Sequence, residues 1–168
     1  CRGTIRRTRF WYWWWIINQI TNYLIVSYLK KVYQIKKSIK NLKEDMKIGV
    51  PKEIKPQEHR IGLTPDSVKT LISEGHEVLV ENNGGFEAGF ENEQYTSVGA
   101  KIIDKAEDIF NDADIIVKVK EPQSGEVKMI RENQIVYTYL HLAAAKELTE
   151  GLIKSKGVCI AYETVTDD

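Results

Sequence analysis

Short runs of branched apolar residues alternate with helix-forming stretches from residue 46 to the end of the chain. The run Ile115-Ile116-Val117 has no polar interruption, which is typical of a strand covered on both faces of a parallel sheet. Parallel neighbours need long crossovers, and helices usually supply them. The pattern therefore predicts an α/β fold, a Rossmann-like and mostly parallel sheet with helices on both faces.

Six strands are expected, at Met46–Val50, Glu77–Glu81, Lys101–Ile103, Asp114–Lys118, Ile135–Leu140 and Val158–Tyr162. The first helix has start and stop signals, with Thr64 as N-cap, Pro65 at its first position and Gly75 at its end. Asn92 is expected to cap a short helix that Gly99 ends. Further helices are expected at Ala106–Asn111, near Gly125–Arg131, and at Lys146–Ser155, the last with Leu148, Leu152 and Ile153 facing inward.

The glycine-rich stretch Gly84–Gly89 predicts a turn with positive-φ glycines rather than a phosphate loop. No two glycines in the chain are separated by one residue, so the sequence has no G-x-G-x-x-G and no cofactor-binding residue is assigned. No two histidines have metal-ligand spacing, so no metal site is assigned either. His59 and His76 are interpreted as structural.

Three basic residues follow the expected strands Met46–Val50, Asp114–Lys118 and Ile135–Leu140: Arg60, Lys120 and His141. A guanidinium binds a carboxylate through two hydrogen bonds, an ammonium polarises a carbonyl, and an imidazole moves a proton near neutral pH. Each residue alone is equally typical of a solvated loop or a structural position. Their coincidence at one end of a parallel sheet favours a shared site for a small oxo or amino acid. Glu121 and Glu163 are candidates to orient a base.

Residues 1–45 differ sharply in charge from the remainder. They carry ten Lys/Arg against two Asp/Glu, whereas residues 46–168 carry fourteen against twenty-two. Phe10–Leu29 is mostly apolar and long enough to cross a bilayer. It could be a membrane anchor, a basic amphipathic segment on a membrane surface, or translated upstream sequence before a native start at Met46. We expect the third, a helical or disordered extension that is not a domain, and hence no membrane association.

The acidic part of the chain gives no reason to expect a nucleic-acid partner. Cys1 and Cys159 are the only cysteines, and Cys159 lies in an apolar run. We interpret it as a small buried hydrophobic residue, with no disulfide, which fits a reducing cytoplasm.

The motifs resemble those of alanine dehydrogenase. Met46–Lys55 is similar to that family's opening strand and loop, and His59-Arg60 through Thr64-Pro65 to its substrate-carboxylate segment. The runs Lys118-Val119-Lys120-Glu121-Pro122 and Tyr139-Leu140-His141-Leu142-Ala143 are similar to its catalytic segments, and Ala161–Val165 to the end of its first substrate-domain stretch. The resemblance implies that Arg60 and Lys120 bind the substrate carboxylate and carbonyl, and that Lys120 and His141 are catalytic, His141 as general acid/base.

By the same resemblance, residues 46–168 are an incomplete substrate domain of an enzyme that oxidises L-alanine to pyruvate and ammonium. NAD would be bound by a domain absent from this chain, which also carries the family's active-site Asp, so the piece alone is expected to be inactive. The resemblance also implies a homo-oligomer, a hexamer. Two relatives remain open, the α-subunit N-terminal domain of NAD(P) transhydrogenase and the lysine-forming saccharopine dehydrogenases. A non-catalytic membrane-tethered module is the alternative from a different class.

Overall fold

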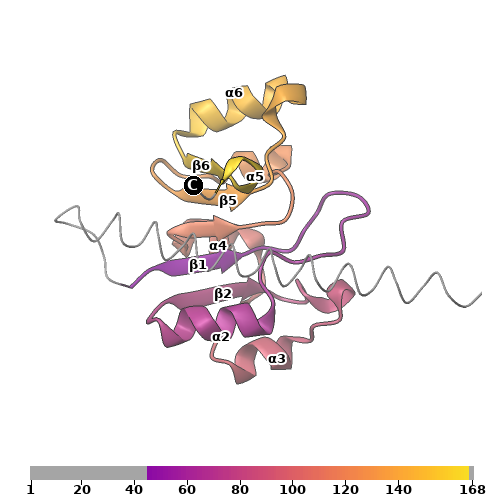
Figure 1. Cartoon of the computed structure of the whole chain (residues 1–168), viewed down its shortest axis with the longest axis vertical. Coiled ribbons are helices and arrows are strands. Elements are labelled where there is room, and N and C mark those ends of the chain that lie inside the picture. The colour runs from indigo at the N-terminus through magenta and orange to yellow at the C-terminus, as the bar shows by residue number, and fades with distance from the viewer. Residues whose placement is uncertain (1–44, 167–168) are drawn as a thin grey trace, which may run out of the picture. The chain divides into compact units, whose positions relative to one another are not determined.

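The computed structural model describes residues 45–166, which form one parallel six-stranded sheet flanked by helices (Figure 1). The strands are β1 (Lys47–Val50), β2 (Glu77–Glu81), β3 (Lys101–Ile103), β4 (Ile115–Val117), β5 (Ile135–Thr138) and β6 (Val158–Ala161). Their spatial order is β3-β2-β1-β4-β5-β6, with every neighbouring pair parallel. This is the Rossmann order, and its topological switch point lies between β1 and β4. The predicted fold class is therefore confirmed.

The helices cover both faces of the sheet. They are α2 (Pro65–Ser73), α3 (Asn92–Ser97), α4 (Ala106–Asp112), α5 (Ser124–Val127) and α6 (Lys146–Ser155), with short 3₁₀ turns η1 (Phe86–Ala88), η2 (Leu142–Ala144) and η3 (Tyr162–Thr164). Parallel crossovers are right-handed, and the chain reverses its direction of travel across the sheet after β3. Consequently α2 and α3 lie on one face, and α4, α5 and α6 on the other.

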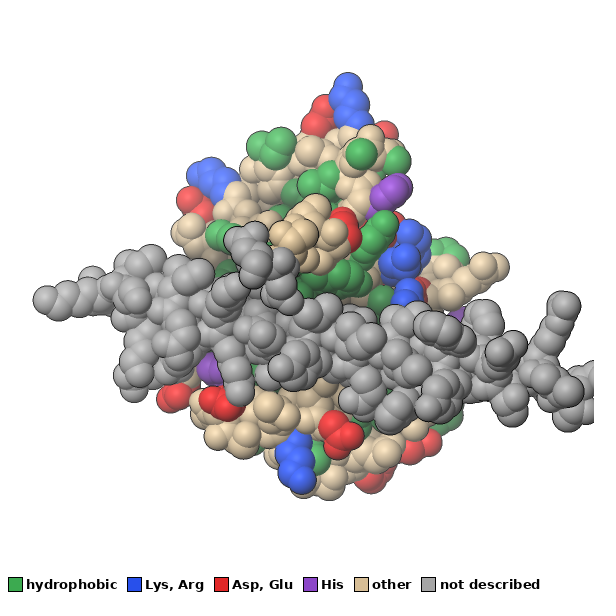
Figure 2. All heavy atoms as spheres, viewed as in Figure 1, with side chains coloured by type: hydrophobic (Ala, Val, Ile, Leu, Met, Phe, Trp, Pro, Cys, Tyr) green, Lys and Arg blue, Asp and Glu red, His purple; other side chains and the backbone are tan. Residues whose placement is uncertain are grey.

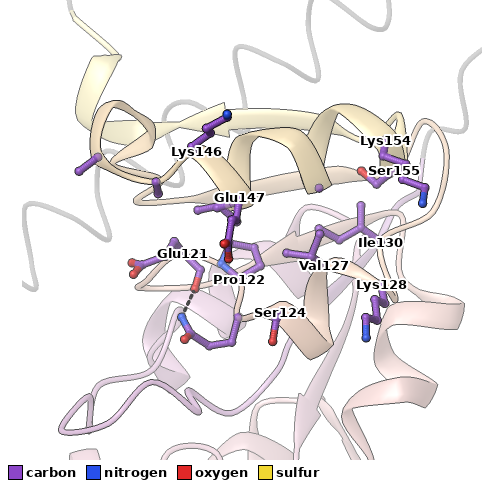
Figure 3. Close-up of a pocket in the computed structure, with 15 residues that line it drawn as sticks. Glu121, Pro122, Ser124, Val127, Lys128, Ile130, Lys146, Glu147, Lys154 and Ser155 are labelled. Carbon is purple, nitrogen blue, oxygen red and sulfur yellow. Dashed lines mark hydrogen bonds between the residues drawn. The ribbon is translucent and has the colours of Figure 1, made fainter.

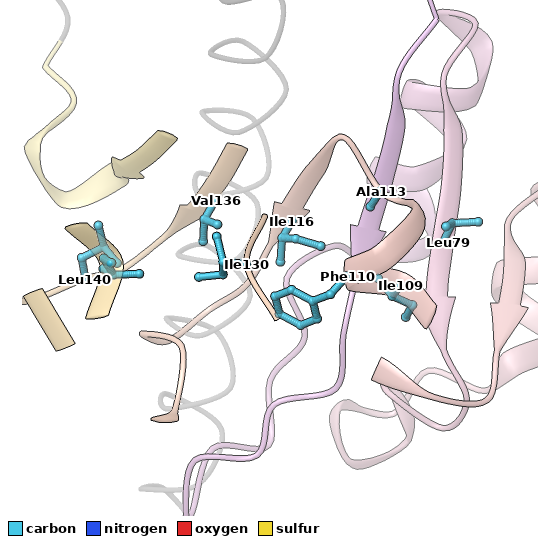
Figure 4. Close-up of a cluster of buried hydrophobic side chains, with 9 residues drawn as sticks. Leu79, Ile109, Phe110, Ala113, Ile116, Ile130, Val136 and Leu140 are labelled. Atoms are coloured by element: carbon cyan, nitrogen blue, oxygen red, sulfur yellow. The ribbon is translucent and has the colours of Figure 1, made fainter. Parts of the chain in front are cut away.

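The face under α4, α5 and α6 holds an apolar core (Figure 4). Its buried members come from strands and helices alike: Leu79, Ile109, Phe110, Ala113, Ile116, Ile130, Val136, Leu140 and Leu152. Helix α4 approaches β1 closely at Gly49, where an added Cβ would lie 2.8 Å from the Ala113 Cβ and would also collide with Ile109. Cys159 packs against this core and is half-buried, and burial raises the pKa of its thiol.

The signals at the ends of α2 act as the sequence predicts. Thr64 has extended backbone angles, its hydroxyl accepts the N–H of Ser67, and Pro65 is the first helical residue. Gly75 follows the helix with φ +93°, a left-handed conformation that glycine adopts without steric cost. The strand predictions hold as well. Glu77–Glu81 and Lys101–Ile103 match in full, and the other four strands are shorter by one or two residues at one or both ends.

Two predictions about helices are wrong. The N-cap of α3 is Glu91, whose N–H donates to the Gln94 side chain, and Asn92 is already helical. The Asn92 side chain bridges instead to the loop before it, donating to Asn82 and accepting from the Asn83 N–H. Ile153 was expected inward but is 73 % exposed, because it lies about 100° around α6 from the buried Leu152.

The prediction for the stretch Gly84–Gly89 is right about a turn but wrong about its first two glycines. Gly85 has φ −90°, and the left-handed positions are Asn83 and Gly89. Gly85 is required for space, because an added Cβ would lie 2.8 Å from the Tyr95 ring. The expectations for residues 1–44, including the apolar segment Phe10–Leu29, lie outside the described residues. Within residues 45–166, no helix has the length and apolar character needed to span a membrane.

Candidate active site at the sheet's switch point

The three basic residues singled out from the sequence follow three adjacent strands. Arg60 lies in the loop between β1 and α2, Lys120 lies just past β4, and His141 lies just past β5. Since these strands are parallel neighbours, their carboxyl ends lie at one edge of the sheet, beside the switch point. Basic side chains and a histidine lie close together at the edge to which β1 points (Figure 2).

Lys120 and His141 contact the same aromatic ring. The Lys120 Nζ atom lies 4.9 Å from the centroid of the Tyr139 ring, and the His141 imidazole stacks on that ring at 5.8 Å and 13°. The Tyr139 hydroxyl is also 3.4 Å from His141 Nδ1. Tyr139 thus contacts both an ammonium and an imidazole, and His141 is exposed rather than directed into the core.

Arg60 is held by a carboxylate of its own loop. Its Nε and Nη2 atoms donate to Glu58 at 2.7 and 2.6 Å, and its backbone N–H also donates to Glu58 at 3.0 Å. Burial opposes the charge of Glu58, but these bonds and the nearby Lys120 ammonium outweigh it and lower the pKa of the carboxyl. A guanidinium has five N–H groups, and among the described residues the Nη1–Nη2 edge of Arg60 keeps two parallel ones for a ligand carboxylate.

Tyr162, in η3, contacts the segment of Lys120 and lies within the electrostatic influence of Arg60. Its hydroxyl donates to the Val119 carbonyl oxygen at 2.6 Å, and its ring lies 6.1 Å from that of Tyr139. Burial raises the pKa of Tyr162 to about 12, with the Arg60 charge acting in the opposite direction. The phenol is therefore protonated at neutral pH and remains a donor.

The segment Val119–Glu121 is held by contacts from β5 and from the loop after β1. The Thr138 hydroxyl donates to the Lys120 carbonyl oxygen at 2.7 Å, and Lys55 forms an ion pair with Glu121. Glu121 is therefore engaged by the loop after β1, and does not orient the imidazole.

Glu163 holds the segment of His141 through the backbone. One carboxylate oxygen accepts the N–H groups of Leu140 and His141, at 3.0 and 2.9 Å. His141 has φ +48° and ψ +43°, a left-handed conformation that is uncommon outside glycine. The two hydrogen bonds fix this conformation, which ends the extended chain and turns it into η2.

The sequence analysis missed a buried charge cluster next to the segment of Lys120. Lys118 is fully buried, with its Nζ atom 3.2 Å from Glu53 and 2.8 Å from Glu126, both also buried. Glu53 in turn accepts the Val119 N–H at 2.7 Å. Burial, the largest influence, raises the pKa of Glu53. A lysine inside an apolar strand pattern was the available signal, since such residues are almost never fully buried unless paired.

A groove of about 870 Å³ runs between α5 and α6 and begins next to the segment of Lys120 (Figure 3). Its walls are mixed, with apolar side chains such as Val127 and Leu148 and the ends of Lys128, Lys146 and Lys154. Arg60, Lys120 and His141 do not line it. The groove is therefore a neighbour of the candidate site and not its centre.

The described residues do not fit a dinucleotide. In a Rossmann nucleotide site the turn from the first strand to the first helix is glycine-rich and presents free amides to the phosphates. Here the loop Pro51–Thr64 has one glycine, Gly62, where an added Cβ would meet the Val117 carbonyl oxygen at 2.5 Å. Pro65 has no N–H, and the Ser67 N–H is taken by Thr64. Residues 45–166 also contain no group of three His, Cys, Asp or Glu able to hold a metal.

The fold and the site define an α/β protein of the Rossmann type with cationic side chains at its switch point. The chain belongs to the family described as alanine dehydrogenase/PNT, N-terminal domain, which matches residues 49–168. Its resemblance to alanine dehydrogenase is therefore confirmed.

Similar proteins support the same family. The chain is 53 % identical over 123 residues to an alanine dehydrogenase of Bacillus subtilis strain 168, covering 73 % of this chain and 32 % of that protein. It is 50 % identical over 120 residues to an alanine dehydrogenase of Staphylococcus epidermidis, and this match covers 71 % of this chain and 32 % of that protein. The chain thus spans about a third of the length of these relatives.

Two solved structures are similar in fold. An L-alanine dehydrogenase matches with a TM-score of 0.69 and 49 % identity, covering 71 % of this chain and 33 % of that one. A transhydrogenase from Sinorhizobium meliloti matches with a TM-score of 0.68 but only 26 % identity. This match covers 73 % of this chain and 36 % of that one. The two folds match almost equally well, and the sequence favours the dehydrogenase.

Proposed function

We propose that residues 46–168 are the substrate-binding part of an NAD-dependent alanine dehydrogenase, which converts L-alanine and water to pyruvate and ammonium while NAD is reduced. The observation that carries the proposal is the convergence of Lys120 and His141 on Tyr139, beside the loop of Arg60. NAD would be bound by a separate domain outside these residues, since this part of the chain does not fit it. The 168 residues alone are then inactive as a dehydrogenase.

In this proposal Arg60 binds the substrate carboxylate with its Nη1–Nη2 edge, while Glu58 holds the Nε–Nη2 edge. The guanidinium is thus oriented before the ligand arrives, which lowers the entropic cost of binding. Lys120 donates to the substrate oxygen and stabilises the negative charge that develops on it. His141 accepts the proton when water adds to the imine and returns it in the reverse reaction.

The partners follow from the same proposal. The substrate is a three-carbon amino acid or its oxo acid, and the enzyme is a cytoplasmic homo-oligomer, a hexamer by resemblance, without a nucleic-acid or membrane partner. The transhydrogenase alternative ranks second because the matched transhydrogenase structure is 26 % identical to this chain, against 49 % for the matched alanine dehydrogenase structure.

A chimera tests the proposal. Residues 46–168 replace the matching part of the Bacillus subtilis alanine dehydrogenase, and NADH oxidation is followed with pyruvate and ammonium. We expect turnover, and a loss of about 10²–10⁴ in kcat for His141→Ala, the usual contribution of a general acid/base. Glycine and serine as alternative substrates measure the specificity. A folded chimera without turnover, or with full activity after His141→Ala, would contradict the proposal.

A further inference from the structure

The Val119 N–H, next to Lys120, donates to a carboxylate from another segment. Glu53 Oε1 accepts this N–H at 2.7 Å and lies 3.5 Å from the Lys120 nitrogen. Glu53 belongs to the loop after β1 that also carries Arg60. One buried side chain thus joins the segments of two proposed substrate-binding residues.

The carboxylate of Glu53 is itself held by charge. Glu53 is 6 % exposed and Lys118 is 1 % exposed, so both charges are removed from water. Among the described residues neither Lys118 Nζ nor Glu53 Oε2 has a well-directed hydrogen bond, so the 3.2 Å contact is an attraction between charges. An ion pair buried in this way is weak evidence for stability, because desolvation cancels most of the attraction.

Lys118 has a second partner whose surroundings differ. Glu126 lies 2.8 Å from Lys118 Nζ and accepts the Gln123 N–H at the start of α5. It makes no hydrogen bond to Val119 or Lys120. The cluster therefore holds two carboxylates against one ammonium, and only one of the two carboxylates contacts the segment of Lys120.

From this asymmetry we infer that Glu53 is a positioning residue of the active site, which fixes the peptide Val119–Lys120 and thereby aims the Lys120 ammonium at the substrate oxygen. Lys118 keeps the Glu53 carboxylate in place through the 3.2 Å contact. The inference rests on the proposed function for the role of Lys120. The backbone contact itself does not depend on it.

The first arm of the test measures the contact in the full 168-residue chain. Glu53→Gln and Glu126→Gln each remove one charge from the same buried cluster and leave one carboxylate for Lys118, so both variants are expected to fold. In ¹H–¹⁵N NMR spectra the Val119 amide proton should move upfield in Glu53→Gln, because a bond to a charged acceptor is replaced by a weaker neutral one. Glu126→Gln should leave this resonance in place. Equal shifts in the two variants would overturn the inference.

The second arm measures catalysis in the dehydrogenase chimera. Glu53→Leu removes the acceptor and should lower kcat by about 10- to 100-fold with little change in KM, as expected when a catalytic group is misplaced. Glu53→Gln keeps an acceptor oxygen and should recover most of the loss, and Glu126→Gln should retain full kcat. An unchanged kcat in Glu53→Leu, or equal losses in Glu53→Gln and Glu126→Gln, would overturn the positioning role. If the unsubstituted chimera has no turnover, the proposed function fails, and the NMR arm still decides whether Glu53 fixes Val119.

Discussion

Glu163 binds His141 through the peptide backbone and not through the imidazole, with its Oε1 atom 2.9 Å from the His141 nitrogen. The same oxygen accepts the N–H of Leu140, whose side chain is buried in the core. The imidazole therefore keeps its ring nitrogens for Tyr139 and for a substrate. The carboxylate contributes by fixing a strained backbone, a role that its place in the sequence does not reveal.

Glu163→Ala should lower the free energy of unfolding by about 1–3 kcal/mol, because two backbone N–H groups lose their acceptor. It should also release the left-handed conformation of His141, which persists only while its surroundings enforce it. Urea unfolding of the 168-residue chain measures the change in the free energy of unfolding. The chemical shift of the His141 amide reports the change in backbone conformation. Glu163→Gln retains an acceptor oxygen and is the matched control. A stability of Glu163→Ala equal to that of the parent chain would show that water replaces the carboxylate at no cost.

Gly49→Ala should destabilise the chain by about 1–3 kcal/mol, the usual cost of overpacking. The new methyl group would collide with Ile109 on α4 and lie 2.8 Å from the Cβ of Ala113, which follows that helix. Gly125→Ala is the control, since an added Cβ there has no neighbour within 4 Å among the described residues and the position is helical. Denaturant midpoints of the two variants should therefore move in opposite directions or differ clearly. Equal midpoints would mean that α4 shifts away from β1 without cost.

Alkaline pH should destabilise the folded chain partly through Tyr162. Burial, opposed by Arg60, raises the pKa of this phenol from 10.0 to about 12. Between these values the unfolded chain has lost a proton that the folded chain retains, so the free energy of unfolding falls as the pH rises, and it is unaffected well below pH 10. Tyr162→Phe removes this contribution. The free energy of unfolding of Tyr162→Phe should decline less than that of the parent chain between pH 9 and 11, as measured by circular dichroism in urea. Parallel declines in the two proteins would argue against a contribution from Tyr162.

Arg60→Lys in the chimera should raise KM for pyruvate more than it lowers kcat. Lysine retains the charge but cannot bind Glu58 with one edge and a carboxylate with the other. Arg131→Lys is the matched control, because Arg131 donates to the carbonyl oxygens of Phe110 in α4 and of Ala113, which follows that helix. That variant should lose stability and keep its KM. If Arg60→Lys leaves KM unchanged, the substrate carboxylate binds elsewhere.

The sequence predicts the sheet because its strands are continuous apolar runs, such as Ile115–Val117, and because Thr64-Pro65 marks the start of a helix without ambiguity. It predicts that Arg60, Lys120 and His141 share one edge, since strand ends in a parallel sheet share a side. Their roles remain predictions. The sequence does not predict the contacts of Glu53, Tyr162 and Glu163, because these residues reach the site only through tertiary packing between segments far apart in the chain. The sequence also misplaces Ile153. This residue follows the buried Leu152 and was expected on the same helix face, but it points to solvent.

The connection of Tyr162 and Glu163 to the segments of Lys120 and His141 has a consequence for the order of assembly. These tethers span 43 and 22 residues of sequence, so neither can form until η3 has been synthesised and has docked. The strands can pair earlier, since a neighbour in the sheet is enough for them. During synthesis on the ribosome the scaffold therefore precedes the site, and the nascent sheet exists for a time with its substrate-binding edge still loose. A ligand that met the chain in that interval would find the side chains present but not yet arranged.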